Sequence, residues 1–244
     1  MKSLLLAMFL IATTTHAQDA LVVSADVNRL RDGSGGGISA LWIHPRGNDT
    51  FIAGATFLSL PQTRWAYATL GDTRRLSART TVNAEANLGS GSDARGDFRY
   101  ILLRAGATRE LIARTLYGEA EWLQSDVARQ QDGIARIGGT WLPIEPLTLR
   151  ASIYESIFGD SDTSLATIRA DYDLGPLTAI AGTTTGTAIP ALLQQPGTQG
   201  SRVRELFAGV TVDNAGRPWT IIASTLTVAH ERRHRVTVSW RLPM

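Results

Sequence analysis

The sequence predicts an all-β protein: a single closed antiparallel up-and-down transmembrane β-barrel of about 14 strands, with about 12 as the alternative. Three observations lead to this prediction. Segments of alternating apolar and polar residues recur along the chain. These segments exceed the about 5–6 residues usual in soluble strands. Short turns alternate with longer, more polar connections, as in barrels that cross a membrane.

The first 17 residues have the features of a secretory signal peptide. Lys2 supplies the positive n-region, Leu4–Ala12 is an apolar run, and Ala17 is a small residue at the expected cleavage site. The run is too short for the about 20 apolar residues that a spanning helix needs. We therefore expect a signal peptide at 1–17 and one barrel domain at 18–244, with no spanning helix in the exported chain.

The clearest strand pattern lies in Arg75–Gly89. Even positions, such as Val82 and Leu88, are mostly apolar or small, and odd positions, such as Arg79 and Glu85, are polar. A period of two places these sets on opposite faces of a strand. The same alternation occurs in Thr115–Leu123, Leu147–Phe158, Ser164–Leu174 and Arg235–Leu242.

Taken in order, the strands are expected to begin near residues 20, 37, 50, 65, 75, 98, 111, 133, 147, 164, 176, 203, 219 and 233. The alternation is weakest near 37, 65 and 176, which keeps the smaller barrel as the alternative. The expected tight turns contain Gly, Pro, Asn or Asp. They are Pro45–Asp49, Gly71–Arg74, Gly106–Glu110, Leu142–Pro146, Asp173–Pro176 and Asp213–Pro218.

The connections between these turns are expected at the other end of the barrel. The longer ones are Asp32–Gly37, Gly89–Asp97, Ser125–Gly133, Gly159–Ser164 and Gly186–Arg202, while Leu60–Arg64 and Ala229–Arg232 are short. An even strand number places both termini on the side of the tight turns. A soluble sandwich is the alternative, and it would leave Gly186–Arg202 as a long insertion without a role.

Aromatic residues near the strand ends favour the membrane barrel, because such residues form girdles at the two membrane interfaces. They are Trp42, Phe51, Trp65, Phe98, Trp122, Trp141, Phe158, Trp219 and Trp240. The last strand, Arg235–Leu242, alternates and carries a late aromatic, and the chain then ends in Leu242-Pro243-Met244 rather than in a terminal Phe or Trp.

With these features the chain resembles the Gram-negative outer-membrane β-barrel proteins. The resemblance covers the whole of 18–244 as a pattern and includes no diagnostic motif. It implies a location in the outer membrane, contact with membrane lipid and lipopolysaccharide, and recognition of the C-terminal strand by the outer-membrane assembly machinery.

The segment His230-Glu231-Arg232-Arg233-His234 matches the H-E-x-x-H pattern of zinc proteases. That site needs a helix, which brings the two histidines onto one face. The flanking residues alternate and are β-branched, and residues four apart on a strand lie about 13 Å from each other. No third ligand follows His234. We therefore expect no metal, no cofactor and no enzyme activity, and a surface hairpin at this segment.

Composition excludes further classes of function. The chain has no cysteine, so it has neither disulfides nor thiol chemistry, and no G-x-S-x-G motif occurs. Its 24 basic and 22 acidic residues are nearly balanced and form no basic patch with interleaved aromatics. We therefore expect no nucleic-acid partner. Lys2 is the only lysine, so the barrel itself contains arginine alone as a permanent cation.

The polar faces of the strands are expected to line the lumen, and they supply the candidate solute-binding residues. These are Arg75, Arg79, Glu85, Tyr117, Glu119, Glu121, Arg150, Tyr154, Arg169 and Asp171. If the arginines cluster around an open pore, the barrel is a porin-like channel for small solutes, with a preference for anionic ones.

If the arginines and carboxylates instead pair across the interior, the barrel is a closed structural or interaction component of the envelope or of polysaccharide export. It would then act through its extracellular loops. Strand register decides between the two, and a barrel of about 12–14 strands lies between filled and open ones. Gly186–Arg202 is expected either to fold into the lumen or to contact a partner.

Overall fold

The computed structural model is a closed barrel of 14 antiparallel strands, which confirms the predicted fold class and the larger strand number. It describes residues 19–30, 33–61, 63–93, 96–112, 114–125, 130–159, 163–188, 201–213, 217–228 and 231–244. Within these ranges there is no helix long and apolar enough to cross a membrane.

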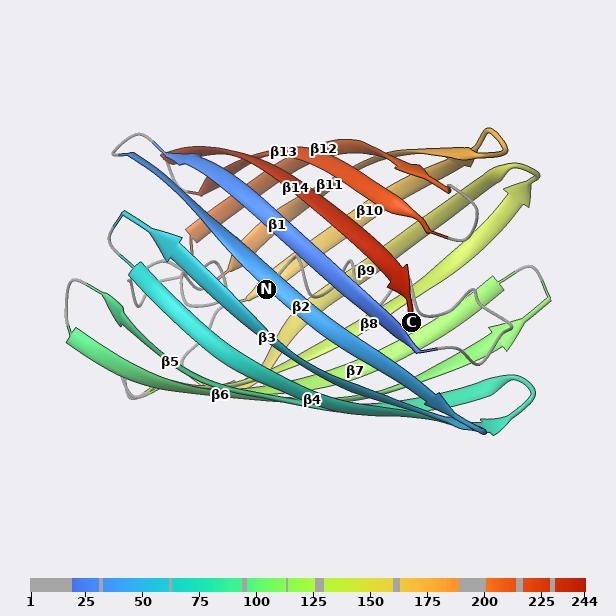
Figure 1. Ribbon diagram of the computed structural model, residues 1–244, viewed down its shortest axis with the longest axis horizontal. Coiled ribbons are helices and arrows are strands. Elements are labelled where there is room, and N and C mark those ends of the chain that lie inside the picture. The colour runs from blue at the N-terminus through green and yellow to red at the C-terminus, as the bar shows by residue number, and fades with distance from the viewer. Residues whose placement is uncertain are drawn as a thin grey trace.

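Each strand pairs with its neighbours in sequence, and the strands wind around one axis (Figure 1). Their bounds are β1 Ala20–Leu30, β2 Gly33–Arg46, β3 Asp49–Leu60, β4 Thr63–Ser77, β5 Thr80–Asp93, β6 Gly96–Leu111, β7 Arg114–Ser125, β8 Gln130–Ile144, β9 Leu147–Gly159, β10 Ser164–Asp173, β11 Leu177–Ala188, β12 Ser201–Val212, β13 Trp219–Val228 and β14 Glu231–Pro243.

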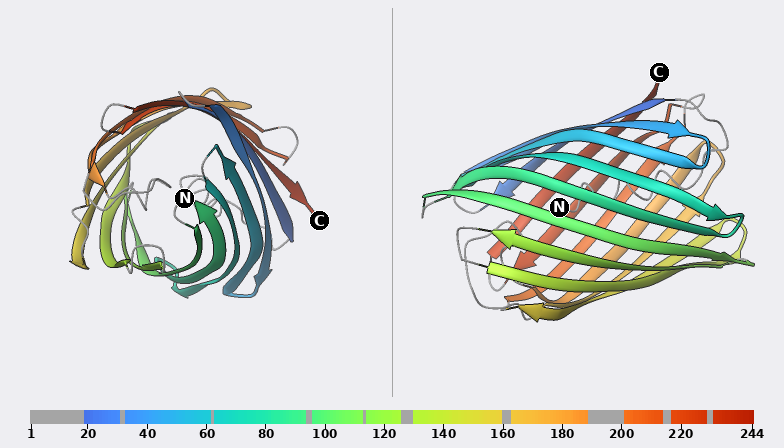
Figure 2. Two further views of the ribbon diagram at one scale, coloured as in Figure 1. Left: turned by 90° about the vertical axis from the view of Figure 1, so that its left-hand side faces the viewer. Right: turned by 90° about the horizontal axis from the view of Figure 1, so that it is seen from below.

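The barrel closes where the first and last strands meet (Figure 2). β1 and β14 pair from Ala20 opposite Pro243 to Arg29 opposite His234. The backbone N–H of Met244 donates to the carbonyl of Asp19 at 2.8 Å, so both ends of the described chain lie at one end of the barrel. The turns between β2 and β3, β4 and β5, and β8 and β9 lie at this end, called below the short-turn end. The opposite end is the long-loop end.

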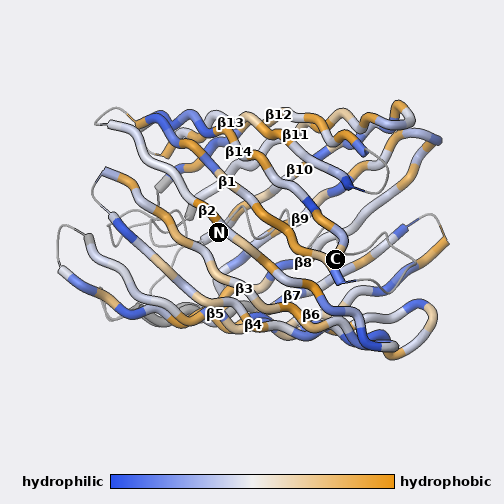
Figure 3. The backbone as a smooth tube through the Cα atoms, viewed as in Figure 1, coloured by the Kyte–Doolittle hydropathy of each residue, from blue (hydrophilic) through white to orange (hydrophobic). Residues whose placement is uncertain are grey.

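The two faces of the wall differ as the alternation predicts. In β5, Glu85 and Asn87 are buried inside while Leu88 is half exposed on the outside. Orange, apolar positions therefore alternate with blue, polar ones along the strands (Figure 3). The exposed outward side chains include Val27, Ile38, Phe57, Leu70, Leu103, Leu116, Ile137, Ile153, Ile168, Leu206 and Val236. They form the apolar outer surface that a lipid-facing wall requires.

Two predicted turns are wrong in position. Gly71–Arg74 has turn chemistry, yet it lies inside β4, which continues to Ser77, and the chain reverses at Ala78 and Arg79. Gly71 faces Glu85 of β5 across the sheet. A register shift between Arg75 and Ser77 then carries the strand into the turn. Gly106–Glu110 is likewise part of β6, which ends at Leu111.

Several predicted loops at the long-loop end are strand instead. β2 begins at Gly33 and β5 continues to Asp93, so the glycine-rich stretches Asp32–Gly37 and Gly89–Asp97 are largely paired. A Cβ on Gly89 would overlap the Tyr67 side chain, and one on Gly91 would overlap the Phe98 ring. Glycine is found here because neighbouring side chains lie over the backbone, not because the chain turns.

The remaining long-loop connections are only partly described. β7 ends at Ser125 and β8 begins at Gln130, so Ser125–Gly133 is also shorter than expected. Of Gly186–Arg202, the first three residues end β11 and the last two begin β12. The rest of that loop lies outside the described residues. The expectation that it folds into the lumen or contacts a partner concerns these residues.

Candidate functional site: the barrel lumen

An enclosed hydrogen-bond network joins β4, β5 and β6 inside the barrel. Nη1 of Arg104 contacts Oε1 of Glu85 at 3.0 Å, and the side chains are 0% and 3% exposed. The Asn87 amide donates to the same carboxylate at 2.7 Å, and the Thr69 hydroxyl donates to Asn87 at 2.6 Å. Register places Arg104 directly opposite Glu85, so the two charges neutralise each other across one strand pair.

A second ion pair lies on β7, β8 and β9. Nη1 of Arg136 donates to Glu119 at 2.9 Å, and Nη2 donates to the Tyr117 hydroxyl at 3.2 Å. The guanidinium carbon lies 4.8 Å from the Tyr117 ring centroid and 5.0 Å from that of Tyr154. A planar cation placed over two rings and a carboxylate is held firmly in the wall. Gly138 leaves the space for the Tyr117 ring.

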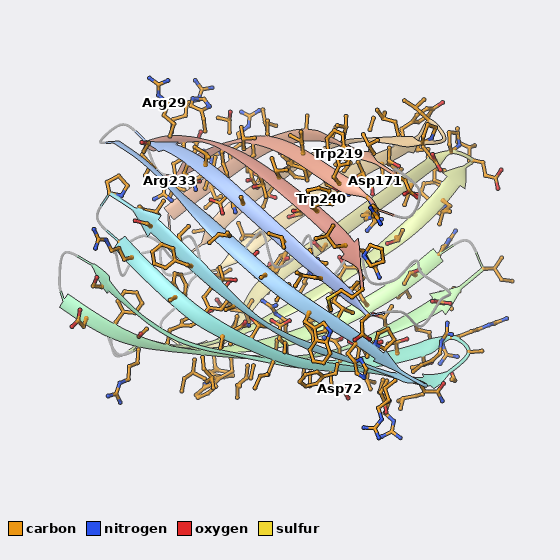
Figure 4. The ribbon with its side chains drawn as sticks, in the orientation of Figure 1. Arg29, Asp72, Asp171, Trp219, Arg233 and Trp240 are labelled. Atoms are coloured by element: carbon orange, nitrogen blue, oxygen red, sulfur yellow. The ribbon has the colours of Figure 1, made fainter. Side chains whose placement is uncertain are left out.

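The third charged group differs because it contains two cations and one anion. Arg150 and Arg169 are directly opposite on β9 and β10. Their Nε atoms contact the two oxygens of Asp171, at 3.0 Å from Arg150 and 2.6 Å from Arg169. Asp171 points inward at the short-turn end (Figure 4). One carboxylate shared by two guanidiniums leaves a local excess of positive charge.

Polar contacts also cross the seam between β1 and β14. Nη2 of Arg235 lies 3.5 Å from the Asp26 carboxylate, and the Ser24 hydroxyl donates to Ser239 at 2.9 Å. The barrel is therefore closed by side chains as well as by the backbone ladder.

Aromatic residues fill part of the inner wall toward the long-loop end. Trp65 packs edge-to-face with Tyr100, with ring centroids 4.7 Å apart, and with Phe98 at 6.2 Å. Tyr67, Leu58, Leu60 and Leu102 complete this apolar cluster. Trp65 and Phe98 were expected in an interfacial girdle, but their strand positions face inward and they belong to this cluster instead. Trp141 and Trp240 are half exposed on the outer face.

The structure brings together seven of the ten predicted site residues. Glu85, Tyr117, Glu119, Tyr154, Arg150, Arg169 and Asp171 all take part in the three groups above. The backbone of Glu121 pairs with Arg104, but its side chain lies outside the described ones. Arg75 lies in β4 opposite Thr81, next to the β4–β5 turn, and Arg79 lies in that turn; both are exposed, and neither belongs to the three groups above.

The sequence did not single out three arginines that bind lumen carboxylates: Arg104, Arg136 and Arg235. On β6, Arg104 shares its face with Tyr100 and Leu102, so that face does not stand out as polar. On β8, Arg136 likewise shares its face with Ile134 and Gly138. The available signal was a single arginine inside a long strand, where a charge must face the lumen and find a partner.

Residues Glu231–His234 of the H-E-x-x-H match lie on β14, opposite Thr225–Val228. The backbone there is extended, so it does not have the helical geometry of the zinc site. Nδ1 of His234 instead lies 3.1 Å from the Thr225 hydroxyl. His230 lies outside the described residues.

Comparison with solved structures identifies the architecture. The toluene transporter TodX of P. putida superposes with a TM-score of 0.67 at 12% identity, over 94% of this chain and 91% of that chain. The chain has the fold of outer-membrane β-barrel channels. The toluene transporter TbuX of Ralstonia pickettii gives a TM-score of 0.66 at 9% identity, over 94% and 90% of the two chains. The monoaromatic hydrocarbon channel CymD gives 0.70 at 9% identity, over 94% and 89%.

At these identities the similarity establishes the fold alone. No protein-family model matches the sequence, and no curated protein matches it.

Proposed function

We propose that this protein is inserted in the outer membrane and forms a channel for small solutes, with a modest preference for anions. The short-turn end would face the periplasm, as in bacterial barrels of this class. The observation that supports a channel is the closed 14-stranded barrel, whose outer surface is apolar and whose inner wall is polar.

The anion preference rests on the charges of the inner wall. Arg104 and Arg136 each face one carboxylate and contribute little net charge. Arg150 and Arg169 share Asp171, so this group of three carries one net positive charge. A ring or cluster of cations in a pore favours anions. Because most lumen charges are paired, the preference should be modest.

Planar-bilayer conductance of the refolded 18–244 chain tests this proposal. Under a salt gradient we expect steady openings and a reversal potential that indicates anions. The variant R150Q/R169Q should lose this preference, whereas R109Q/R114Q, which removes two exposed arginines from the outer wall at the same end, should keep it. A folded barrel that never conducts would contradict the channel.

A second candidate is passage of apolar aromatic molecules, since TodX and CymD are monoaromatic hydrocarbon channels. The inward cluster of Trp65, Tyr67, Phe98 and Tyr100 favours it here, because aromatic rings bind one another edge-to-face. Liposome uptake of toluene distinguishes the two candidates. The variant W65L should slow uptake if this cluster lies on the route, and it should leave ion selectivity unchanged.

A further inference from the structure

Five basic side chains gather on the outer surface of the barrel at the long-loop end, and the lumen does not use them. They are exposed and belong to three of the strands around the seam: Arg29 on β1, Arg202 and Arg204 on β12, and Arg232 and His234 on β14. Arg29 points away from the wall (Figure 4). These five residues are called the outer basic cluster.

Strand register brings the members of the outer basic cluster close together. Arg29 is directly opposite His234, and Arg232 lies two positions further along the same face of β14. Arg204 and Arg232 both pair with Thr227 of β13, so two strand spacings separate them. That corresponds to about 10 Å. Three guanidinium groups and one imidazole can therefore reach one anionic group or two adjacent ones.

The described side chains of the wall around the cluster supply no opposite charge. Among the described side chains, no Asp or Glu faces outward in the long-loop halves of β11, β12, β13, β14, β1 and β2. Arg64 and Arg99, on the outer surface of β4 and β6, differ because Asp97 lines the same groove of about 520 Å³. The arginines of the outer basic cluster therefore have no counter-charge among the described side chains of this wall, and an anion from outside the chain would balance them.

The cluster also borders the apolar surface on all three strands. The next outward position toward the short-turn end is Val27 after Arg29, Leu206 after Arg204, and Val236 after His234. Their exposures are 65%, 52% and 46%. A ligand that contacts both the outer basic cluster and these apolar residues has an anionic group at the long-loop end. Its acyl chains lie next to that group, toward the short-turn end. A soluble anion would not use the apolar positions.

We propose that the outer basic cluster binds the phosphorylated headgroup of lipopolysaccharide, with the acyl chains along Val27, Leu206 and Val236. This inference rests on the proposed function only in that the barrel must be inserted with its long-loop end outward. The guanidinium groups of Arg29, Arg204 and Arg232 donate charged hydrogen bonds to phosphate oxygens. The hydroxyls of Thr225 and Thr227 on β13 face the same side.

The test titrates the full refolded chain in detergent with fluorescent rough lipopolysaccharide. The variant R29Q/R204Q/R232Q should weaken binding about tenfold or more, since charged hydrogen bonds are lost. The control R46Q/R109Q/R114Q removes three exposed arginines from the short-turn end, and it should bind like the unmodified chain. Heat-modifiable migration on gels establishes whether each variant folds. If the triple variant does not fold, the single variant R204E is compared with the unmodified chain instead.

Three results would overturn the proposal: equal binding by the triple variant and the control, equal binding of dephosphorylated lipid A, or displacement by millimolar inorganic phosphate alone. The last would identify the ligand as free phosphate. Conductance separates this inference from the channel, because the altered side chains face away from the lumen. A triple variant that conducts normally but binds lipopolysaccharide weakly supports the site, whereas a silent unmodified barrel contradicts only the channel.

Discussion

Arg104 and Glu85 form an ion pair that is sealed from solvent, with 3.0 Å between Nη1 and Oε1. Two such charges are costly to bury, and they are tolerated because register sets them directly opposite and Asn87 adds a further hydrogen bond. In this part of the wall an arginine and a carboxylate pair across the interior, as the sequence analysis expected of a closed barrel. A pore was expected to have clustered arginines, and this feature occurs where Arg150 and Arg169 share Asp171.

The Glu85→Gln variant should be strongly destabilised. It removes the carboxylate that Arg104 contacts and leaves the guanidinium buried, which costs about 3–5 kcal/mol in comparable pairs. Denaturant unfolding in detergent micelles, followed by tryptophan fluorescence, measures the loss. Glu110→Gln, which alters an exposed carboxylate at the end of the same β6, is the control and should unfold like the original chain. Equal midpoints for both variants would contradict the role of the pair.

The Tyr154→Leu variant should destabilise the wall at Arg136. The ring lies 5.0 Å from the guanidinium, and a cation–π contact out of water contributes about 2 kcal/mol. Tyr154→Phe keeps the ring and should lose much less of the free energy of unfolding. The same unfolding experiment compares the two variants. If Phe and Leu cost equally, the ring face does not stabilise Arg136.

The Gly138→Ala variant should disturb the same site from the opposite side. A Cβ at Gly138 would overlap the Tyr117 ring and lie 2.6 Å from the carbonyl oxygen of Ala151, so ring or backbone must move. Gly118→Ala is the matched control, because its nearest neighbour would be the carbonyl oxygen of Arg136 at 3.9 Å. We expect a lower unfolding midpoint for Gly138→Ala only. Similar midpoints would show that the Tyr117 ring can move aside without cost.

The alternation of the sequence predicted the barrel, its strand number and, in the five segments where it is clearest, which face turns inward. Glu85 and Asp171 were identified because most neighbours on the same strand face are polar: Asn83 and Asn87 beside Glu85, and Arg169 and Asp173 beside Asp171. Arg104 and Arg136 were missed because their inner faces also carry Leu102 and Ile134, so a lumen that is part apolar hides its charged members. Which arginine meets which carboxylate also depends on strand register, and a single sequence does not determine the register.

Glycine caused the other errors. Gly71 and Gly89 were taken as turn or loop residues, since glycine relaxes the backbone restrictions that turns impose. In the barrel both are paired inside strands, and a Cβ on Gly89 would overlap the Tyr67 side chain. Glycine occurs both in turns and where a neighbouring side chain packs closely against the backbone. Only the neighbouring strand distinguishes the two cases. That error moved a turn and placed Arg79, which lies in the turn, inside a strand.

The Asp171→Asn variant should increase the anion preference of the channel. It removes the one carboxylate that Arg150 and Arg169 share, so two guanidiniums remain at the short-turn end without it. The reversal potential under a salt gradient should shift further toward that of anions. The measurement is made on single channels in planar bilayers at low ionic strength, where screening is weakest.

Asp72→Asn is the control for this experiment, because Asp72 lies toward the same end of the barrel but is exposed on the outer face of β4 (Figure 4). It removes the same charge and should leave selectivity unchanged. The double variant R150Q/D171N restores the charge balance and should return the reversal potential toward that of the unmodified chain. A shift of equal size in Asp72→Asn and Asp171→Asn would mean that total charge, not the inward group, sets the selectivity.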